Sequence, residues 1–223
     1  MLKKPTGILF DLDGTFADTA PDLAYALNQT LIDYQQKTLP FDQIRPVVSH
    51  GGKALIKLGF DLPEDSEAFE ERRQHLLQVY LNNLSRETAL FEGIEDVLGH
   101  IEGHNIAWGI VTNKPDWLTD PLMQEMGFSH RTKAIVSGNT CARAKPYPDS
   151  ILHACSLLEI DPKTTWYVGD AGRDMQAGRS AGNQTIGATY GYIYDDDPIE
   201  HWDADALIDQ PVDLIDLINS ADA

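Results

Sequence analysis

Cysteine is scarce in this sequence, whose 223 residues include only Cys141 and Cys155. Two widely separated cysteines cannot supply a four-cysteine metal site or a Cys-x-x-Cys redox pair. A pair this sparse in a chain of this length is typical of reduced thiols, so we expect the protein to be cytoplasmic.

Positive charge is also in short supply. The chain has 17 lysines and arginines against 35 aspartates and glutamates, which gives a net charge of −18. Long-range repulsion at this charge disfavours binding to nucleic acid and to anionic membrane surfaces. If the ligand is itself an anion, a divalent cation and a few well-placed Lys or Arg side chains must offset this field locally.

Long hydrophobic runs are absent as well. No segment approaches the roughly 18 apolar residues of a membrane-spanning helix, and the apolar stretch before Asp11 is too short for a signal peptide. Hydrophobic residues nevertheless make up 42% of the chain and charged residues 23%, as in ordinary globular proteins. The composition therefore allows one core with a small second domain.

Short apolar runs alternate with helical patterns along most of the chain. The runs cover residues 7–10, 106–111, 134–136, 165–168, 185–188 and 206–208. Runs of this length are typical of buried strands, and apolar residues at helical spacing lie between them. The alternation predicts an α/β fold: a doubly wound parallel sheet with helices on both faces.

The interval between the first two runs is too long for a single crossover, since a strand-helix-strand unit needs about 30 residues. Its helical patterns include 41–48 and 53–59, and it contains no convincing strand. We predict an all-helical insertion at residues 20–86, with a sheet-containing core made of 1–19 and 87–223. The charged run at 64–73 is interpreted as a solvated helix face.

Polar residues follow four of the predicted strands. They are Asp11, Asp13, Thr112, Asn113, Lys145, Asp170 and Asp174. Each alone has an ordinary explanation, such as a helix cap or a solvated loop lysine. Ligands of such sheets bind outside the carboxyl ends of the strands, so together these residues predict a single site.

The residue types suit phosphoryl transfer. Two carboxylates two positions apart project to the same side of a strand end, so we expect Asp11 to attack phosphorus and Asp13 to act as acid and then base. Carboxylates that face a phosphate dianion need a divalent cation, and oxygen ligands select Mg²⁺. Lys145 adds positive charge, while Thr112 and the backbone N–H of Asn113 can donate hydrogen bonds to the transferring group.

These segments resemble the four motifs, in order, of the haloacid dehalogenase superfamily of phosphohydrolases. They are DLDGT at 11–15, Thr112 with Asn113, Lys145 in AKPYPD, and GDAGRD at 169–174. The likeness spans residues 7 to about 191, and the helical insertion is similar to the cap domain of that family. The resemblance implies a Rossmann-like catalytic core under a helical cap.

The same resemblance implies roles for the acidic residues. An aspartyl-phosphate would form on Asp11, and Mg²⁺ would be held by Asp11, the backbone carbonyl of Asp13, and Asp170. Asp174 would act largely through neighbouring groups. The implied protein is a Mg²⁺-dependent phosphoric monoester hydrolase that acts on a small phosphorylated metabolite, as a monomer or homodimer.

Two branches of the superfamily stay open. DLDGTFADTAPDL and VTNKP resemble phosphoglycolate phosphatases, whereas AWGIVTNKPDW, YGY and WDADALID resemble bacterial phosphatases of N-acetylmuramic acid 6-phosphate. The insertion is expected to contact the unreactive part of the substrate. We predict a contact loop of His50, Gly51, Gly52 and Lys53, in which Lys53 meets a substrate carboxylate. The alternative is a plain turn with Lys53 in solvent.

Non-enzymatic readings are weaker. Signalling receiver domains also combine acids, Mg²⁺, Thr and Lys, but their acidic pair is adjacent, their phosphorylated aspartate stands on a later strand, and they lack a helical insertion. A phosphatase fold retired to phosphate binding normally loses its nucleophile or its acid, and both Asp11 and Asp13 are present.

Overall fold

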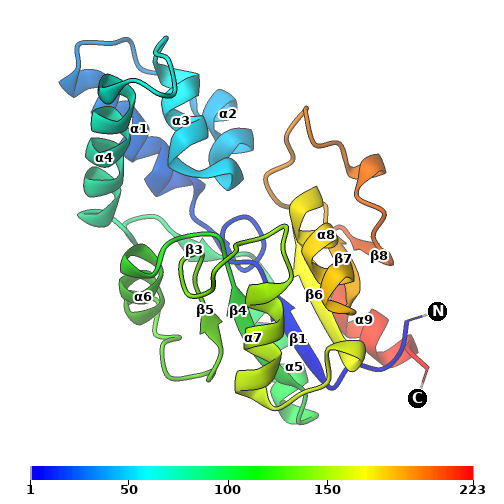
Figure 1. Cartoon of the computed structure of the whole chain (residues 1–223). Helices are drawn as coiled ribbons and strands as arrows, with labels where there is room; N and C mark the ends of the chain where they lie inside the picture. The colour runs from blue at the N-terminus through cyan, green and yellow to red at the C-terminus, as the bar shows by residue number, and fades with distance from the viewer. Residues whose placement is uncertain (1, 223) are drawn as a thin grey trace.

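A six-stranded parallel sheet forms the centre of the computed structural model, which describes residues 2–222 (Figure 1). The strand order is β5-β4-β1-β6-β7-β8. The strands are β1 (Gly7–Phe10), β4 (Ala107–Val111), β5 (Ile135–Val136), β6 (Thr165–Gly169), β7 (Gln184–Ala188) and β8 (Ala206–Ile208). All six predicted strands are confirmed, with ends that differ from the prediction by no more than one residue.

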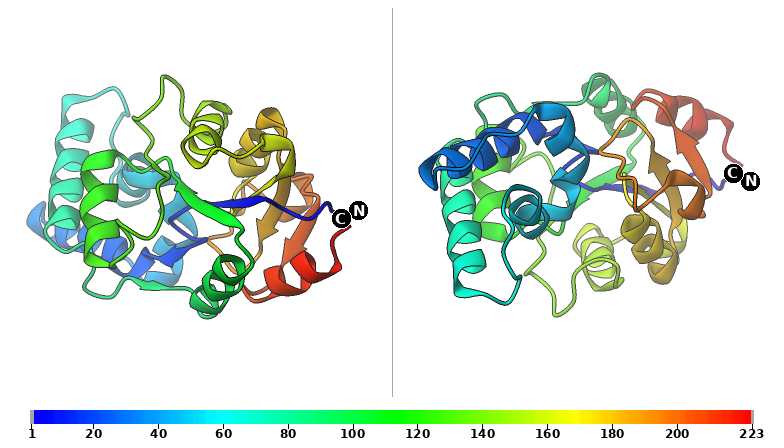
Figure 2. Two further views of the ribbon diagram at one scale, coloured as in Figure 1. Left: turned by 90° about the horizontal axis from the view of Figure 1, so that it is seen from below. Right: turned by 90° about the horizontal axis from the view of Figure 1, so that it is seen from above.

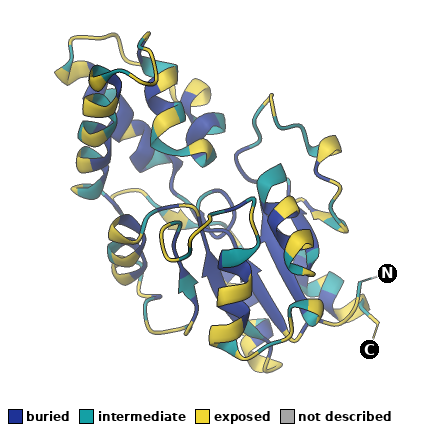
Figure 3. Ribbon diagram, in the orientation of Figure 1, coloured by how far each residue is buried: buried dark blue, intermediate teal, exposed yellow. Residues whose placement is uncertain are grey.

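Helices cover both faces of this sheet (Figure 2). One face packs against α5 (Ile94–Gly103) and α9 (Asp213–Ser220), and the other against α7 (Asp149–Leu158) and α8 (Gly172–Ala181). Side chains alternate along β1, with Ile8 and Phe10 in the first core cluster and Leu9 in the second. The doubly wound arrangement is therefore confirmed, and Figure 3 shows its strands buried between exposed outer helix faces.

The remaining helices complete the chain. They are α1 (Ala20–Asp33), α2 (Phe41–Ile44), α3 (Gly51–Gly59), α4 (Glu67–Leu81) and α6 (Asp116–Glu125), with 3₁₀ turns at Arg45–His50, Pro162–Thr164 and Ile199–His201. Helices α1 to α4 stand together beyond the carboxyl ends of the strands, as a helical cap (Figure 1). The domain limits of 20–86 for the cap and 1–19 with 87–223 for the core stay a prediction. Among the helices of residues 2–222, none combines the length and apolar character needed to cross a bilayer.

The chain leaves and re-enters the core side by side. Strand β2 (Ala17–Asp18) pairs antiparallel with β3 (Ala89–Leu90), just before and just after the helical insertion. This pair leaves no sign in the sequence, because two-residue strands are too short to show a period. It places both connections to the cap next to the loop that carries Asp11 and Asp13.

Asp22, in the first turn of α1, fastens the two connections together. Its side chain is 2% exposed. The carboxylate accepts hydrogen bonds from the backbone N–H of Glu87 (3.1 Å) and from the N–H and hydroxyl of Thr88 (2.9 and 2.8 Å). Asp22 therefore ties the start of the insertion to the segment that returns to the core.

Asp22→Ala is expected to lower the free energy of unfolding by about 2–4 kcal/mol, because it removes a buried carboxylate that accepts several hydrogen bonds from the segment returning to the core. Urea denaturation followed by circular dichroism measures the change. Asp42→Ala is the matched control, since Asp42 is an exposed acid in the first turn of α2. Equal unfolding midpoints for the two variants would contradict a structural role for Asp22.

Candidate active site

The loop after β1 brings Asp11 and Asp13 to the edge of the sheet. It turns at Gly14, where φ is +86° and a Cβ atom would lie 2.0 Å from Oδ2 of Asp170. Only glycine fits this combination of positive φ and close approach. The first and fourth sequence motifs are therefore in contact through a residue that has no side chain.

Three carboxylates gather beneath this loop. One oxygen from each of Asp11, Asp170 and Asp174 lies within 4.8 Å of the others, and all three residues are buried. Burial, reinforced by Asp174 and opposed by Lys145, raises the pKa of Asp11 to about 6. Burial and the charges of Asp11 and Asp174 raise the pKa of Asp170 to about 7. The positive charges of the surrounding protein therefore do not fully offset the negative charge of the three carboxylates.

Oxygen donors in this cluster fit a hard divalent cation. Both side-chain oxygens of Asp174 are buried and lack a hydrogen bond within residues 2–222, although Oδ1 lies 2.8 Å from Nζ of Lys145. Buried carboxylate oxygens without donors are the ligands that Mg²⁺ or Ca²⁺ would use. The side chain of Asp13 lies outside this group of three.

Lys145 lies beside two of these carboxylates. Its ammonium nitrogen is 2.9 Å from Oδ1 of Asp11 and 2.8 Å from Oδ1 of Asp174, and the side chain is fully buried. It also donates hydrogen bonds to the carbonyl of Val111 (3.0 Å) and the hydroxyl of Tyr167 (2.8 Å). Lys145 thus neutralises part of the carboxylate charge. Its ammonium group is held by two carboxylates, a carbonyl and a hydroxyl.

Asn113 holds Lys145 by its backbone. The Asn113 amide donates to the Lys145 carbonyl at 2.9 Å and accepts from the Lys145 N–H at 3.0 Å. The hydroxyl of Thr112 accepts a bond from the N–H of Lys114 at 3.1 Å. The structure brings Thr112, Asn113 and Lys145 to the same place, and their contact with a phosphoryl group stays a prediction.

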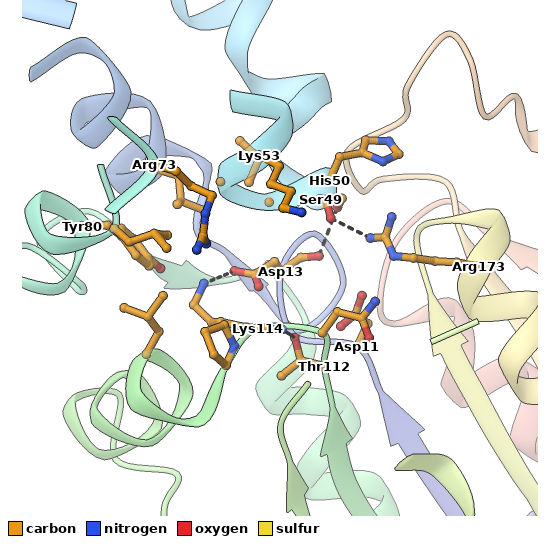
Figure 4. Close-up of a pocket in the computed structure, with 18 residues that line it drawn as sticks. Asp11, Asp13, Ser49, His50, Lys53, Arg73, Tyr80, Thr112, Lys114 and Arg173 are labelled. Atoms are coloured by element: carbon orange, nitrogen blue, oxygen red, sulfur yellow. Dashed lines mark hydrogen bonds and ion pairs between the residues drawn. The ribbon is translucent and has the colours of Figure 1, made fainter. Parts of the chain in front are cut away.

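Asp13 points away from the carboxylate cluster and into the cavity, where it meets a lysine (Figure 4). Its Oδ1 accepts hydrogen bonds from the Thr19 hydroxyl at 2.6 Å and from Nζ of Lys114 at 2.7 Å. Burial opposes the charge of Lys114, but Asp13 and Tyr80 raise its pKa above the ordinary value. Thr19 stands at the N-cap position of α1, yet its hydroxyl bonds Asp13 and makes no capping bond.

A cavity of 430 Å³ separates this edge of the sheet from the cap. The four predicted cap residues, His50, Gly51, Gly52 and Lys53, all line it. They do not form a loop, because His50 ends a 3₁₀ turn and α3 begins at Gly51. The predicted contact loop is therefore corrected to a junction between two helices, which Gly51 permits through its φ of +74°.

Several lining residues were missed from the sequence. Ser49 donates to Oδ2 of Asp170 at 3.0 Å, and its carbonyl accepts a bond of 2.8 Å from Arg173. Arg73 and Tyr80 reach the cavity from α4. The interpretation of 64–73 as a solvated face is wrong for Arg73, the last residue of that run. Lys114 alone had a sequence signal, since it continues the polar group after β4.

Comparisons with known proteins show the family of the chain. The model of the haloacid dehalogenase-like hydrolase family matches residues 8–188. The chain belongs to this family, as the sequence motifs predicted.

Particular relatives carry two different names. The chain is 37% identical over 214 residues to the N-acetylmuramic acid 6-phosphate phosphatase of Pseudomonas aeruginosa, covering 96% of this chain and 95% of that protein. It is 36% identical over 214 residues to the phosphoglycolate phosphatase of Xanthomonas campestris pv. campestris, covering 96% of both. The crystal structure of a predicted phosphoglycolate phosphatase from Haemophilus somnus has a TM-score of 0.85 at 26% identity, covering 97% of this chain and 99% of that one.

Proposed function

We propose that the protein is a Mg²⁺-dependent phosphomonoesterase in which Asp11 is the nucleophile. The observation that carries this proposal is the position of Asp11, which faces the cavity while its carboxylate lies 2.9 Å from Lys145 and within the three-carboxylate cluster. A carboxylate held beside a lysine and a cation site is placed for attack on a phosphoryl group.

Two steps complete the reaction. In the first, an oxygen of Asp11 bonds to phosphorus as the ester P–O bond breaks, and Asp13 gives a proton to the leaving oxygen. In the second, Asp13 takes a proton from water, the water oxygen bonds to phosphorus, and the bond to Asp11 breaks to release phosphate. Asp13 is suited to both steps because it lines the cavity and is oriented by Thr19 and Lys114.

The metal would be held by Asp11, Asp170 and the backbone carbonyl of Asp13, and Asp174, whose Oδ2 has no donor among the described residues, would lie at the same cation. When bound, Mg²⁺ supplies positive charge that offsets repulsion between the carboxylates and the phosphate. Lys145 supplies further charge, and Thr112 with the Asn113 N–H would hold the phosphoryl oxygens.

The substrate proposed is a small anionic metabolite. Phosphoglycolate and N-acetylmuramic acid 6-phosphate are the substrates in the relatives' names, and each carries a carboxylate as well as a phosphate. The 430 Å³ cavity lies in the range of sites for drug-sized ligands, so it accommodates the sugar phosphate as well as the smaller acid. We propose phosphoglycolate phosphatase-like activity, with the amino-sugar 6-phosphate as the second candidate.

Turnover of p-nitrophenyl phosphate tests the proposed chemistry. Hydrolysis is expected in the presence of Mg²⁺ and is expected to stop when a chelator is added. Comparison of kcat/KM for phosphoglycolate and N-acetylmuramic acid 6-phosphate then identifies the better substrate. Absence of turnover on all three compounds would favour a phosphate-binding module over an enzyme.

Magnesium is also expected to stabilise the fold. Occupancy of the carboxylate cluster at about 100 times the dissociation constant contributes about 2.7 kcal/mol, which corresponds to a rise in Tm of roughly 5–10 °C for a chain of this size. Thermal melts of chelator-treated protein with and without MgCl₂ measure the shift. Potassium chloride at the same ionic strength is the control, and an equal shift with both salts would contradict a metal site.

We also propose a cytoplasmic location. Cys141 and Cys155 are both free, and Cys155 is buried. Unpaired thiols are typical of proteins in reducing compartments. Fractionation of the source cells checks this point.

A further inference from the structure

Three cationic side chains line the cavity around Asp13. Lys53 comes from α3, Arg73 from α4 and Lys114 from the turn after β4, and all three line the cavity. Figure 4 shows Lys53 and Arg73 reaching from the cap toward Asp13, and Lys114 reaching it from the opposite side. Three cations in one place are unexpected in a chain whose net charge is −18.

Arg73 is held in a fixed orientation with donors to spare. Its Nε lies 2.7 Å from Oε2 of Glu70 and its Nη2 lies 2.6 Å from Oε1, one helical turn earlier on α4. This two-point contact fixes the plane of the guanidinium group. It leaves Nη1 without a hydrogen-bond partner among the described residues. Arg73 can therefore donate to a ligand without first being reoriented.

Tyr80 adds a second unused donor. Its ring is fully buried and lines the cavity, and its hydroxyl has no hydrogen-bond partner in the described part of the chain. A buried hydroxyl without a partner costs stability, and a ligand oxygen would remove that cost. The ring also lies 4.6 Å from Nζ of Lys114, so the hydroxyl belongs to the same cationic region.

The balance of charge selects the kind of anion. Two of the nearby charges are negative, since Glu70 pairs with Arg73 and Asp13 pairs with Lys114. Lys53 has no carboxylate within 4.0 Å among residues 2–222. On the cap side alone, Lys53 and Arg73 together with Glu70 leave one net positive charge whether or not Asp13 is protonated, and this charge matches a carboxylate better than a second phosphate dianion.

Asp13 fixes where on the substrate this anion must lie. In the proposed reaction Asp13 protonates the leaving oxygen, so the part of the substrate beside Asp13 is the leaving alcohol. We propose that Arg73, Lys53 and the Tyr80 hydroxyl form a subsite that binds a carboxylate on that alcohol. The subsite rests on the proposed phosphomonoesterase function, and it makes Arg73 the main determinant of substrate choice.

Paired substrates test the subsite. Phosphoglycolate is compared with 2-hydroxyethyl phosphate, and N-acetylmuramic acid 6-phosphate with N-acetylglucosamine 6-phosphate, because the second member of each pair lacks the carboxylate. In the wild-type protein the carboxylate member of at least one pair is expected to have the higher kcat/KM. Equal values within both pairs would overturn the proposal.

Substitution of Arg73 separates the subsite from the chemistry. Arg73→Gln is expected to lower kcat/KM for the preferred carboxylate substrate by about 10- to 100-fold, the range for loss of a charged hydrogen bond. This loss is expected to exceed any loss with p-nitrophenyl phosphate, which has no carboxylate, by at least about tenfold. Tyr80→Phe and Lys53→Ala are expected to show the same selectivity with smaller losses. Arg72→Gln is the matched control, because Arg72 is the neighbouring residue on α4 and stacks on Tyr34, outside the cavity.

The outcomes distinguish the two proposals. Failure of the wild-type protein to hydrolyse the two carboxylate substrates and also p-nitrophenyl phosphate would refute the phosphomonoesterase function itself. Normal hydrolysis of that compound, with Arg73→Gln reducing both members of a pair equally or neither, would refute the carboxylate subsite alone. A larger loss for a bisphosphate than for either carboxylate substrate would also overturn it, since the subsite would then bind a second phosphate. Thermal melts confirm that each variant is folded.

Discussion

Asp11→Asn is expected to reduce kcat for p-nitrophenyl phosphate by at least about 10⁴-fold, in the range seen when a catalytic nucleophile is removed. The amide keeps the shape of the side chain and an oxygen that can accept the 2.7 Å hydrogen bond from the Leu12 N–H. It loses the negative charge that attacks phosphorus. The variant is therefore expected to fold while losing the covalent step.

Steady-state kinetics and intact mass measure this effect together. Asparagine can deamidate back to aspartate, so the mass of the variant must be checked after each long incubation. Asp61→Asn, at an exposed position of the cap, controls for loss of one negative charge. Undiminished turnover by mass-verified Asp11→Asn protein would rule out Asp11 as the nucleophile.

Lys145→Ala is expected to damage both stability and activity. Removal of the ammonium group leaves Asp11 and Asp174 as buried carboxylates without a compensating charge, a change that typically costs about 3–5 kcal/mol. It also removes a donor to the Val111 carbonyl. Because Lys145 is beside the nucleophile, kcat is expected to fall by at least about 10²-fold.

Denaturation and kinetics with increasing Mg²⁺ separate these two effects. A divalent cation is expected to recover part of the lost stability, since it compensates the same carboxylates, but not the lost activity. Lys133→Ala, at an exposed position before β5, is the matched control. If the Lys145→Ala protein were as stable as this control, the buried ion pairs would have no structural role.

The sheet was predictable because its strands are buried on both faces. Residues 7–10 form a continuous apolar run that ends abruptly at Asp11. This pattern can be recognised without knowing which strands pair with it. The β2–β3 pair was not predictable, since Ala17–Asp18 and Ala89–Leu90 are far apart in the chain and too short to show a period. Its pairing depends on tertiary contacts such as those of Asp22.

The site residues likewise fall into two groups, those that the sequence predicts and those that depend on tertiary contacts. Residues attached to strand ends, such as Asp11 and Asp170, were predictable because topology alone brings strand ends together. Arg73 and Tyr80 were not, because a charged or aromatic residue on a helix gives no sign of which face meets a cavity. Ser49 contacts Asp170 only through the packing of the cap on the core.

The pairing of β2 with β3 makes the helical insertion, in topological terms, the loop of a β-hairpin. Long loops between paired strands are tolerated because the entropy of closing a loop rises only slowly with its length. A short turn joining Asp18 to Ala89 would close the same hairpin. The whole helical insertion, which would bind the leaving alcohol, can therefore be exchanged in evolution or by design. The strand-end residues proposed to carry out phosphoryl transfer would remain unchanged.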